Sequence, residues 1–260
     1  MTAPTQSSAP DGSVMQIDEP RYLGNRLRGD SVLTDSTGKD FRVVDLLGKP
    51  VILLLSYYGC DGTCPTMNAE LAKVLAKVTR FGLGKDYRVL TVSFDQRDTP
   101  ATANEFLGKT GQMSLVPESM QSGWRHAVIK SGDVRGFAGE VGFNFFWSDT
   151  AKAFLHPNVL IFLTPEGRVA RYIYGTRMDA KTVELALTDA DWERISSTTA
   201  VFDMMTGACF SYNYAEGRYQ LNYSLVAGVG SFLLGITLMA LGGWLYRRKM
   251  AKRIQGETNA

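Results

Sequence analysis

Residues 51–65 read VILLLSYYGCDGTCP, an apolar run followed by two cysteines and a proline. The first seven residues have the length and composition of a buried β-strand. Pro65 suits the first turn of a helix, because the N–H that it lacks would have no partner there. The stretch therefore predicts a strand that runs into a helix, with Cys60 and Cys64 at the junction.

The junction favours the thiolate form of a cysteine, because unpaired backbone N–H groups at a helix start carry partial positive charge. Cys60 and Cys64 are four residues apart, so on a helical turn they share a face and lie within reach of a disulfide. Thiolates exchange disulfides and bind soft metals such as copper(I). Three cysteines are too few for a disulfide scaffold. We therefore interpret the pair as chemical, and both uses stay open.

The flanking sequence alternates strand and helix patterns. Strands are expected at 31–34, 41–44, 51–57, 87–94, 124–129, 159–163 and 169–174, and helices at 65–79, from about 101, at 132–141 and at 179–195. A strand–helix–strand unit followed by a hairpin and a helix is typical of an α/β sandwich of thioredoxin type. We predict such a thioredoxin-like domain over residues 21–195, preceded by a flexible lead at 1–20 that is rich in Ser, Pro and Gly.

An uncharged segment of 23 residues runs from Ser224 to Tyr246. As a helix it would be about 34 Å long, enough for a bilayer core of roughly 30 Å. Lys and Arg crowd its C-terminal side, so the positive-inside rule places the basic tail 247–260 in the cytoplasm and the domain on the outer face. Residues 1–16 have no apolar stretch typical of an export signal. Either the span directs insertion itself or a leader precedes residue 1.

Two features of the C-terminal part have open meanings. Ala227, Ser231 and Gly235 recur every four residues and would allow another helix to approach closely, although glycine is common in membrane helices. The segment 196–223 is expected to link the domain to the span. It contains the third cysteine, Cys209, which we interpret as a packed or spare thiol.

Composition narrows the function classes. A net charge of +2, with no stretch of interleaved basic and aromatic residues, gives no reason to expect nucleic-acid binding. A structural zinc site needs four protein ligands, and the chain has few clustered Cys and His. Of its two histidines, His156 precedes the strand 159–163, and its loop is expected to face the cysteine loop with Pro157 in a cis bond. His126 lies on a predicted strand and is expected to be an ordinary packed or surface residue.

These motifs resemble the SCO/SenC family, copper-handling thioredoxin-fold proteins of respiratory membranes. The similarity covers roughly Leu23 to Ala190. It rests on Cys-x-x-x-Cys-Pro after an apolar strand and on the further matches 48–51 (GKPV), 93–100 (SFDQRDTP), 156–157 (HP), 164–168 (TPEGR) and 174–175 (YG). Two features depart from the common pattern. Gln96 stands where the family commonly has proline, and the span is C-terminal, as in a bacterial subgroup whose Cys-aromatic-x-Tyr motif resembles Cys209–Tyr212.

The resemblance implies a copper site, for Cu(I) and Cu(II), made of Cys60, Cys64 and His156. It implies a metallochaperone rather than an enzyme, one that delivers copper to, or reduces the cysteines of, the dinuclear copper centre of cytochrome c oxidase. The expected location is the bacterial inner membrane with the domain in the periplasm, or else the mitochondrial inner membrane facing the intermembrane space. A thiol–disulfide reductase that does not need His156 and a resident subunit of a respiratory complex stay open as alternatives.

Secondary roles are less specific. Asp95 follows a predicted strand near the presumed site, where it could orient a ligand by hydrogen bonding. Asp98 or Thr99 is expected to cap the helix that begins near residue 101. A group of aromatic residues could shape a docking surface or fill the core beside the sheet: Tyr57, Tyr58, Phe143, Phe145, Phe146 and Trp147.

Overall fold

The computed structural model describes residues 15–116, 118–175, 178–195, 210–213, 218–221 and 223–258. The chain divides into two compact units, one of residues 1–200 with 214–218 and the other of residues 201–213 with 219–260. The first unit contains the predicted domain, and the second contains the long C-terminal helix. Cys209 lies outside the described residues, so its predicted role stays a prediction.

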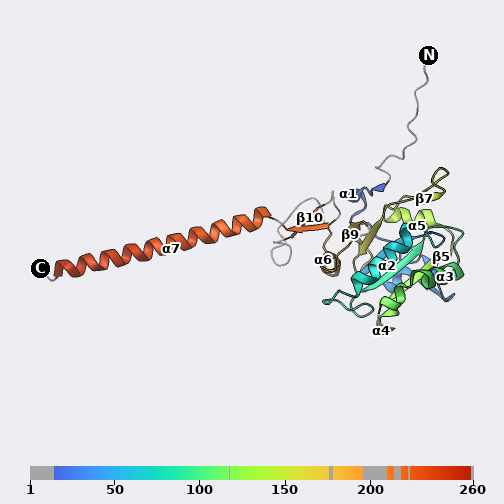
Figure 1. The fold of residues 1–260 in the computed structure, drawn as a ribbon, viewed down its shortest axis with the longest axis horizontal. Helices are drawn as coiled ribbons and strands as arrows, with labels where there is room; N and C mark the ends of the chain where they lie inside the picture. The colour runs from blue at the N-terminus through green and yellow to red at the C-terminus, as the bar shows by residue number, and fades with distance from the viewer. Residues whose placement is uncertain are drawn as a thin grey trace, which may run out of the picture. The chain divides into compact units, whose positions relative to one another are not determined.

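The first unit is built on a seven-stranded sheet in the order β2-β1-β5-β4-β3-β8-β9 (Figure 1). The central strands β3, β4 and β5 run parallel, and the outer neighbours pair antiparallel. The strands of this sheet are β1 (Val32–Asp35), β2 (Asp40–Arg42), β3 (Val51–Ser56), β4 (Arg88–Ser93), β5 (Trp124–Ile129), β8 (Val159–Leu163) and β9 (Val169–Tyr174). This topology confirms the predicted thioredoxin-like α/β sandwich.

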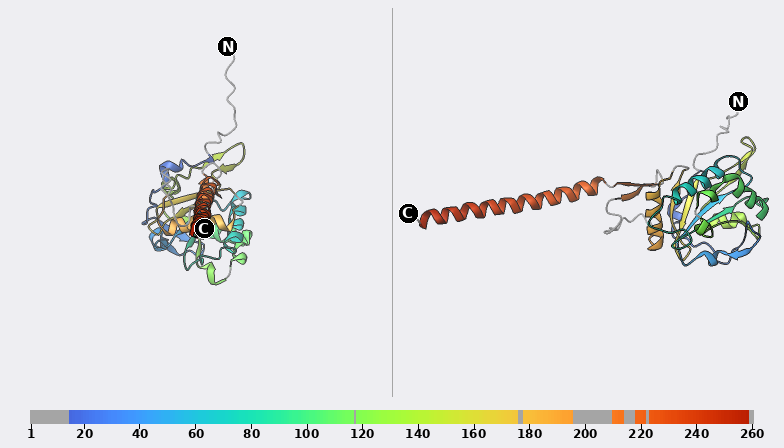
Figure 2. Two further views of the ribbon diagram at one scale, coloured as in Figure 1. Left: turned by 90° about the vertical axis from the view of Figure 1, so that its left-hand side faces the viewer. Right: turned by 60° about the horizontal axis from the view of Figure 1, so that its bottom comes forward.

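Helices cover both faces of the sheet, since every residue of β3 and of β8 is buried. Figures 1 and 2 show them packed around the central strands. Side-chain caps fix several helix starts: Thr99, Asp133 and Asp179 accept hydrogen bonds from backbone N–H groups of the first turn. The helices are α1 (Glu19–Tyr22), α2 (Thr63–Leu75), α3 (Pro100–Thr110), α4 (Glu118–Gln121), α5 (Val134–Glu140) and α6 (Ala180–Asp191), with 3₁₀ turns η2 (Val43–Leu46) and η3 (Gln112–Leu115).

Strand direction brings three distant segments to one edge of the sheet. β3 and β4 are parallel, so the segments after Ser56 and Ser93 leave at the same edge. β8 runs antiparallel to β3, with Val51 opposite Leu163, and therefore begins at that edge. The residues just before β8 must consequently lie beside the loop that follows β3.

Several sequence-based boundaries differ from the structure. Helix α2 begins at Thr63 instead of Pro65, so Cys64 is inside its first turn. A hairpin of three-residue strands, β6 (Phe146–Ser148) and β7 (Ala153–Leu155), was not predicted, because so short a strand shows almost no alternation. The expected cis bond at Pro157 is wrong: no cis peptide occurs in the part of the chain that the structure describes.

The second unit contains α7, Tyr223–Thr258. One segment of it, Ala227–Trp244, is long and apolar enough to cross a membrane, with a mean hydropathy of 1.5 and no burial within the protein. At its C-terminal end the Arg248 guanidinium lies 5.1 Å from the centre of the Trp244 ring. Within the predicted linker, β10 (Phe210–Asn213) and β11 (Arg218–Leu221) form a two-stranded sheet.

Glu19 is expected to make the stability of the domain depend on pH. Burial raises the pKa of Glu19 from 4.5 to about 7, although a hydrogen bond with Tyr174 and the charge of Arg171 oppose the rise. The folded state thus favours the neutral acid. The contribution of Glu19 to the stability of the folded state is therefore fully present below pH 4.5 and is lost as the pH rises through about 7. We expect Glu19→Gln to unfold at a higher urea concentration than wild type at pH 8 and to lose this advantage at pH 4.5. An equal difference in urea midpoint between Glu19→Gln and wild type at both pH values would contradict the raised pKa of Glu19.

Candidate metal centre

The two cysteines lie at the predicted junction of strand and helix. Cys60 is in the loop after β3 and is partly exposed, whereas Cys64 is the second residue of α2 and only 2% exposed. Both are free thiols in the structure. The N–H of Gly62, the residue before α2, points to Cys60 Sγ at 3.3 Å. The helix start therefore supplies the backbone donor that the sequence pattern predicted.

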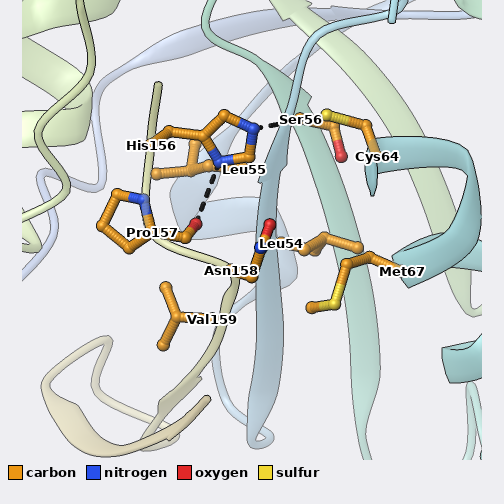
Figure 3. Close-up of a pocket in the computed structure, with 9 residues that line it drawn as sticks. All are labelled: Leu54, Leu55, Ser56, Cys64, Met67, His156, Pro157, Asn158 and Val159. Carbon is orange, nitrogen blue, oxygen red and sulfur yellow. Dashed lines mark hydrogen bonds between the residues drawn. The ribbon is translucent and has the colours of Figure 1, made fainter. Parts of the chain in front are cut away.

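His156 faces Cys64 across the pocket (Figure 3), with its Nε2 atom 3.6 Å from the sulfur. Its Nδ1 atom lies 3.0 Å from the Pro157 carbonyl oxygen. A carbonyl only accepts hydrogen bonds, so Nδ1 carries the proton and the Nε2 lone pair is directed at Cys64. Burial lowers the pKa of His156, more than the Pro157 carbonyl raises it. The imidazole is therefore neutral at pH 7, the form that binds metals.

The thiol pair divides one negative charge unequally. A hydrogen bond from Cys64 is the largest influence on Cys60; together with donors from Tyr57 and Gly62 it outweighs burial and lowers the pKa of Cys60 to about 5. The same hydrogen bond, together with burial, raises the pKa of Cys64. At neutral pH the pair thus consists of a Cys60 thiolate and a Cys64 thiol. A bound cation would offset the cost of ionising the second sulfur.

Alkylation is expected to distinguish the two thiols. Because the pKa of Cys60 is about 5, its reaction with iodoacetamide should stay nearly constant from pH 8 to pH 6 and fall below pH 5. Cys64 is buried and its pKa is raised, so it should react far more slowly throughout. Peptide mass spectrometry of a Cys209→Ser variant measures both rates. A Cys60 rate that falls tenfold per unit between pH 8 and pH 6 would contradict the lowered pKa.

Aromatic rings hold the imidazole from several sides. The ring centres of Phe94 and Phe143 lie 5.0 and 5.7 Å from that of His156, and the Tyr57 ring stands at 90° to it at 6.3 Å. Phe154, on β7 two residues before His156, packs against Phe94 at 5.6 Å. Sequence reasoning missed Phe94 and Phe154, although Phe94 lies between β4 and Asp95 and Phe154 lies two residues before His156.

The aromatic group named from the sequence mostly fills the core. Tyr57, Tyr58, Phe143 and Phe145 are buried. Trp147 is different because it is 42% exposed, and the Arg97 guanidinium lies 5.9 Å from its ring centre.

The Asp95 carboxylate forms hydrogen bonds with the guanidinium of Arg97. Arg97 Nε and Nη2 donate to its two carboxylate oxygens at 3.0 and 2.7 Å. Although burial raises the pKa of Asp95, the hydrogen bonds and charge of Arg97 lower it by more. No hydrogen bond joins Asp95 to Cys60, Cys64 or His156 in the described residues, so its role as an orienting group stays a prediction.

Asp98 supports the cysteine loop directly. Its Oδ2 atom accepts hydrogen bonds from the Tyr58 backbone N–H at 2.7 Å and from the Ser93 hydroxyl at 2.5 Å. It also accepts from the Thr102 hydroxyl in the first turn of α3, whose N-cap is Thr99. Of the two predicted caps, Thr99 is therefore the N-cap, and Asp98 ties the helix start to the residue two before Cys60.

The other histidine, His126, is a core residue. His126 is 2% exposed, stacks on Trp124 at 5.4 Å and lies 2.6 Å from the Gln112 amide. Burial lowers the pKa of His126 to about 3. It takes no part in the cysteine site, as the sequence suggested.

The donor set fits a soft metal without forming a closed site. Two sulfurs and a neutral imidazole nitrogen are ligands that copper accepts readily. Within the described ranges, no three His, Cys, Asp or Glu side chains converge closely enough to hold a metal ion as they stand. A metal held by all three predicted ligands would need Cys60 to lie closer to Cys64 and His156 than it does in this structure.

The fold and the site define a class: thioredoxin-like domains with a CxxxC thiol pair at a helix start and a histidine opposite it. The sequence model of the SCO1/SenC family matches residues 21–188, and the chain belongs to this family. Among curated proteins, none matches the sequence of this chain.

Three solved structures illustrate the similarity. The crystal structure of an Aquifex aeolicus VF5 protein is 33% identical, with a TM-score of 0.58, over 65% of this chain and 95% of that one. A SCO1/SenC family lipoprotein from Bacillus anthracis str. Ames shares the fold at 20% identity and a TM-score of 0.54, over 65% and 98% of the two chains. Bradyrhizobium japonicum ScoI, solved with copper bound, is 20% identical with a TM-score of 0.49, over 62% and 96%.

Proposed function

We propose that this protein is a membrane-anchored copper metallochaperone that helps to build the dinuclear copper site of a respiratory cytochrome c oxidase. The observation that carries the proposal is the neutral His156 Nε2 directed at the Cys64 sulfur from 3.6 Å, next to the thiolate of Cys60. Membership of the SCO1/SenC family supports the same function.

Copper is cargo in this proposal. Cys60 and Cys64 hold Cu(I) as thiolates, and His156 completes the coordination needed for Cu(II). Release proceeds by ligand exchange, in which an acceptor thiolate replaces first the partly exposed Cys60 and then the buried Cys64. The acceptor we propose is the copper-bearing oxidase subunit, whose cysteines can supply such thiolates.

Copper binding by the full-length protein in detergent tests the proposal. Reduced and anaerobic protein is expected to bind one Cu(I) per chain, and the protein with a Cys60–Cys64 disulfide is expected to bind none, because neither sulfur can then ionise. Absence of stoichiometric copper in the reduced protein would overturn the proposal.

The second candidate function is a thiol–disulfide reductase, which is favoured by the partly exposed Cys60 thiolate with a buried thiol beside it. Cys60 would attack a target disulfide and form a mixed disulfide, releasing one target thiolate. Cys64 would then attack the Cys60 sulfur, releasing the second target thiolate and leaving a Cys60–Cys64 disulfide. This reaction does not use His156, so a target-disulfide assay on His156→Ala separates the two functions.

We also propose that α7 anchors the protein, with the domain in the bacterial periplasm and the basic tail 247–260 in the cytoplasm. The length and hydropathy of Ala227–Trp244 and the basic residues that follow support this arrangement. A chain that ends at residue 222 is expected to leave the membrane fraction on alkaline extraction, whereas the full chain stays. Retention of the shortened chain would show that another part holds it. Cleavage of the domain by protease added to spheroplasts tests its side.

A further inference from the structure

A line of buried polar side chains leads from the core to Cys64. Trp124 Nε1 lies 3.0 Å from Thr91 Oγ1, which lies 3.0 Å from Asn68 Oδ1. Asn68 Nδ2 lies 3.1 Å from Ser56 Oγ and 2.9 Å from the Cys64 carbonyl oxygen. All four side chains belong to residues no more than 3% exposed. We call Trp124, Thr91, Asn68 and Ser56 the donor chain.

The direction of the hydrogen bonds in the donor chain follows from its two ends. An indole N–H can only donate, so the Thr91 oxygen accepts from Trp124. A carbonyl oxygen can only accept, so the Asn68 NH₂ group faces the Cys64 carbonyl and Ser56, and Asn68 Oδ1 accepts the Thr91 hydroxyl hydrogen. Both N–H groups are thereby used, one on each of these oxygens.

Ser56 is therefore left with a free hydroxyl hydrogen. Its oxygen accepts from Asn68, and no hydrogen bond donated by Ser56 to an oxygen occurs in the described part of the chain. Ser56 lines the pocket together with Cys64 and His156. Figure 3 shows its hydroxyl beside the Cys64 sulfur, so the uncommitted hydrogen lies in the same pocket as that sulfur.

We propose that the donor chain is a positioning device, which holds the Ser56 hydroxyl on Cys64 Sγ and thereby favours the reduced dithiol over the Cys60–Cys64 disulfide. A sulfur that carries or shares negative charge accepts a hydrogen bond more strongly than a neutral disulfide sulfur. In the copper-loaded protein the same donor withdraws electron density from a thiolate ligand and favours Cu(I) over Cu(II). This second consequence rests on the proposed function, whereas the first does not.

The reaction that tests the donor chain is thiol exchange with dithiothreitol at pH 7, using the copper-free, full-length Cys209→Ser protein in detergent. Cys60–Cys64 disulfide and reduced dithiothreitol give the Cys60 thiolate, the Cys64 thiol and oxidised dithiothreitol. Two electrons and one proton move to the protein, and the second proton of dithiothreitol goes to the solvent. Ser56→Ala is expected to lower the equilibrium constant for reduction about tenfold, equal to about 30 mV. An equilibrium constant within twofold of wild type would overturn the proposal.

Three further variants separate the hydroxyl from packing. Ser56→Thr keeps the O–H and should stay near wild type, so a loss equal to that of Ser56→Ala would contradict the proposal. Thr91→Val removes a hydroxyl of the donor chain that lies away from both sulfurs, and it should lower the equilibrium constant for reduction by a smaller factor. An unchanged constant in Thr91→Val would mean that the donor chain does not position Ser56. Thr188→Ala is the matched control, because Thr188 is buried like Ser56 but its hydroxyl donates to the Glu184 carbonyl within α6. A tenfold loss in Thr188→Ala would make the effect unspecific and overturn the proposal.

The proposal and the function beneath it can fail separately. Urea unfolding of each variant confirms that it is folded before the exchange reaction is read. If wild type binds no copper but Ser56→Ala lowers the dithiol equilibrium, the metallochaperone function fails and the donor chain stands. If wild type binds copper and Ser56→Ala shifts neither the dithiol equilibrium nor the Cu(II)/Cu(I) potential, the donor chain alone is refuted.

Discussion

Replacement of His156 by alanine is expected to weaken Cu(II) binding by more than ~100-fold, because loss of a group that only orients a ligand already costs 10–100-fold. Cu(I) binding should persist, since two thiolates satisfy a soft monovalent ion. Competition with a chelator in each oxidation state, together with the thiolate-to-Cu(II) absorption band, measures both effects in the full-length protein.

His126→Gln is the control for this experiment. His126 is the other of the two histidines in the sequence and lies in the core against Gln112. Its replacement should change stability without changing the copper(II) spectrum. If His156→Ala binds Cu(II) as tightly as wild type, the imidazole is not a ligand and the reductase becomes the better interpretation.

Phe94→Ala is expected to lower the free energy of unfolding by ~3–5 kcal/mol, because it leaves a cavity in the core. Phe94 is 1% exposed, and its ring centre lies 4.7 Å from that of Phe145 and 5.0 Å from that of His156. The imidazole would also lose a wall that orients it, so Cu(II) affinity should fall about tenfold as for other supporting groups. Urea unfolding and chelator competition measure the two effects.

Trp147→Ala gives the matched comparison for Phe94. Trp147 belongs to the same aromatic cluster through Phe154, at 5.2 Å, but it is 42% exposed. Its loss should cost less than ~1 kcal/mol, as substitutions outside the core usually do. Similar costs for Trp147→Ala and Phe94→Ala would mean that the cluster does not derive its stability from burial.

Local patterns were sufficient for most of the fold. The run Val51–Tyr57 is apolar throughout and became the buried strand β3, and the sequence of Asp98, Thr99 and Pro100 became a capped helix start. The strands 124–129, 159–163 and 169–174 have the predicted bounds. Such elements depend on residues two to four apart, so their pattern is visible in the sequence. The hairpin β6–β7 was missed because three residues carry too little of any pattern.

The cysteine pair was visible in the same way, because its chemistry follows from a helix start and a spacing of four. The histidine that faces Cys64 could not be identified from a local pattern, because His156 is 92 positions away. Either histidine could have faced the cysteines until the antiparallel pairing of β3 and β8 was known. Family resemblance pointed to His156, but neither its tautomer nor the pairing of Asp95 with Arg97 could be read from spacing.

By itself, the sequence determined the class of fold, the thiol pair and the candidate membrane span, because each depends on neighbours along the chain. Only the tertiary structure decided which histidine meets Cys64 and which way the hydrogen bonds from Trp124 to Ser56 run. Those contacts join three strands and a helix, so they depend on strand register and on the donor and acceptor capacity of each buried group, and no local sequence pattern carries either.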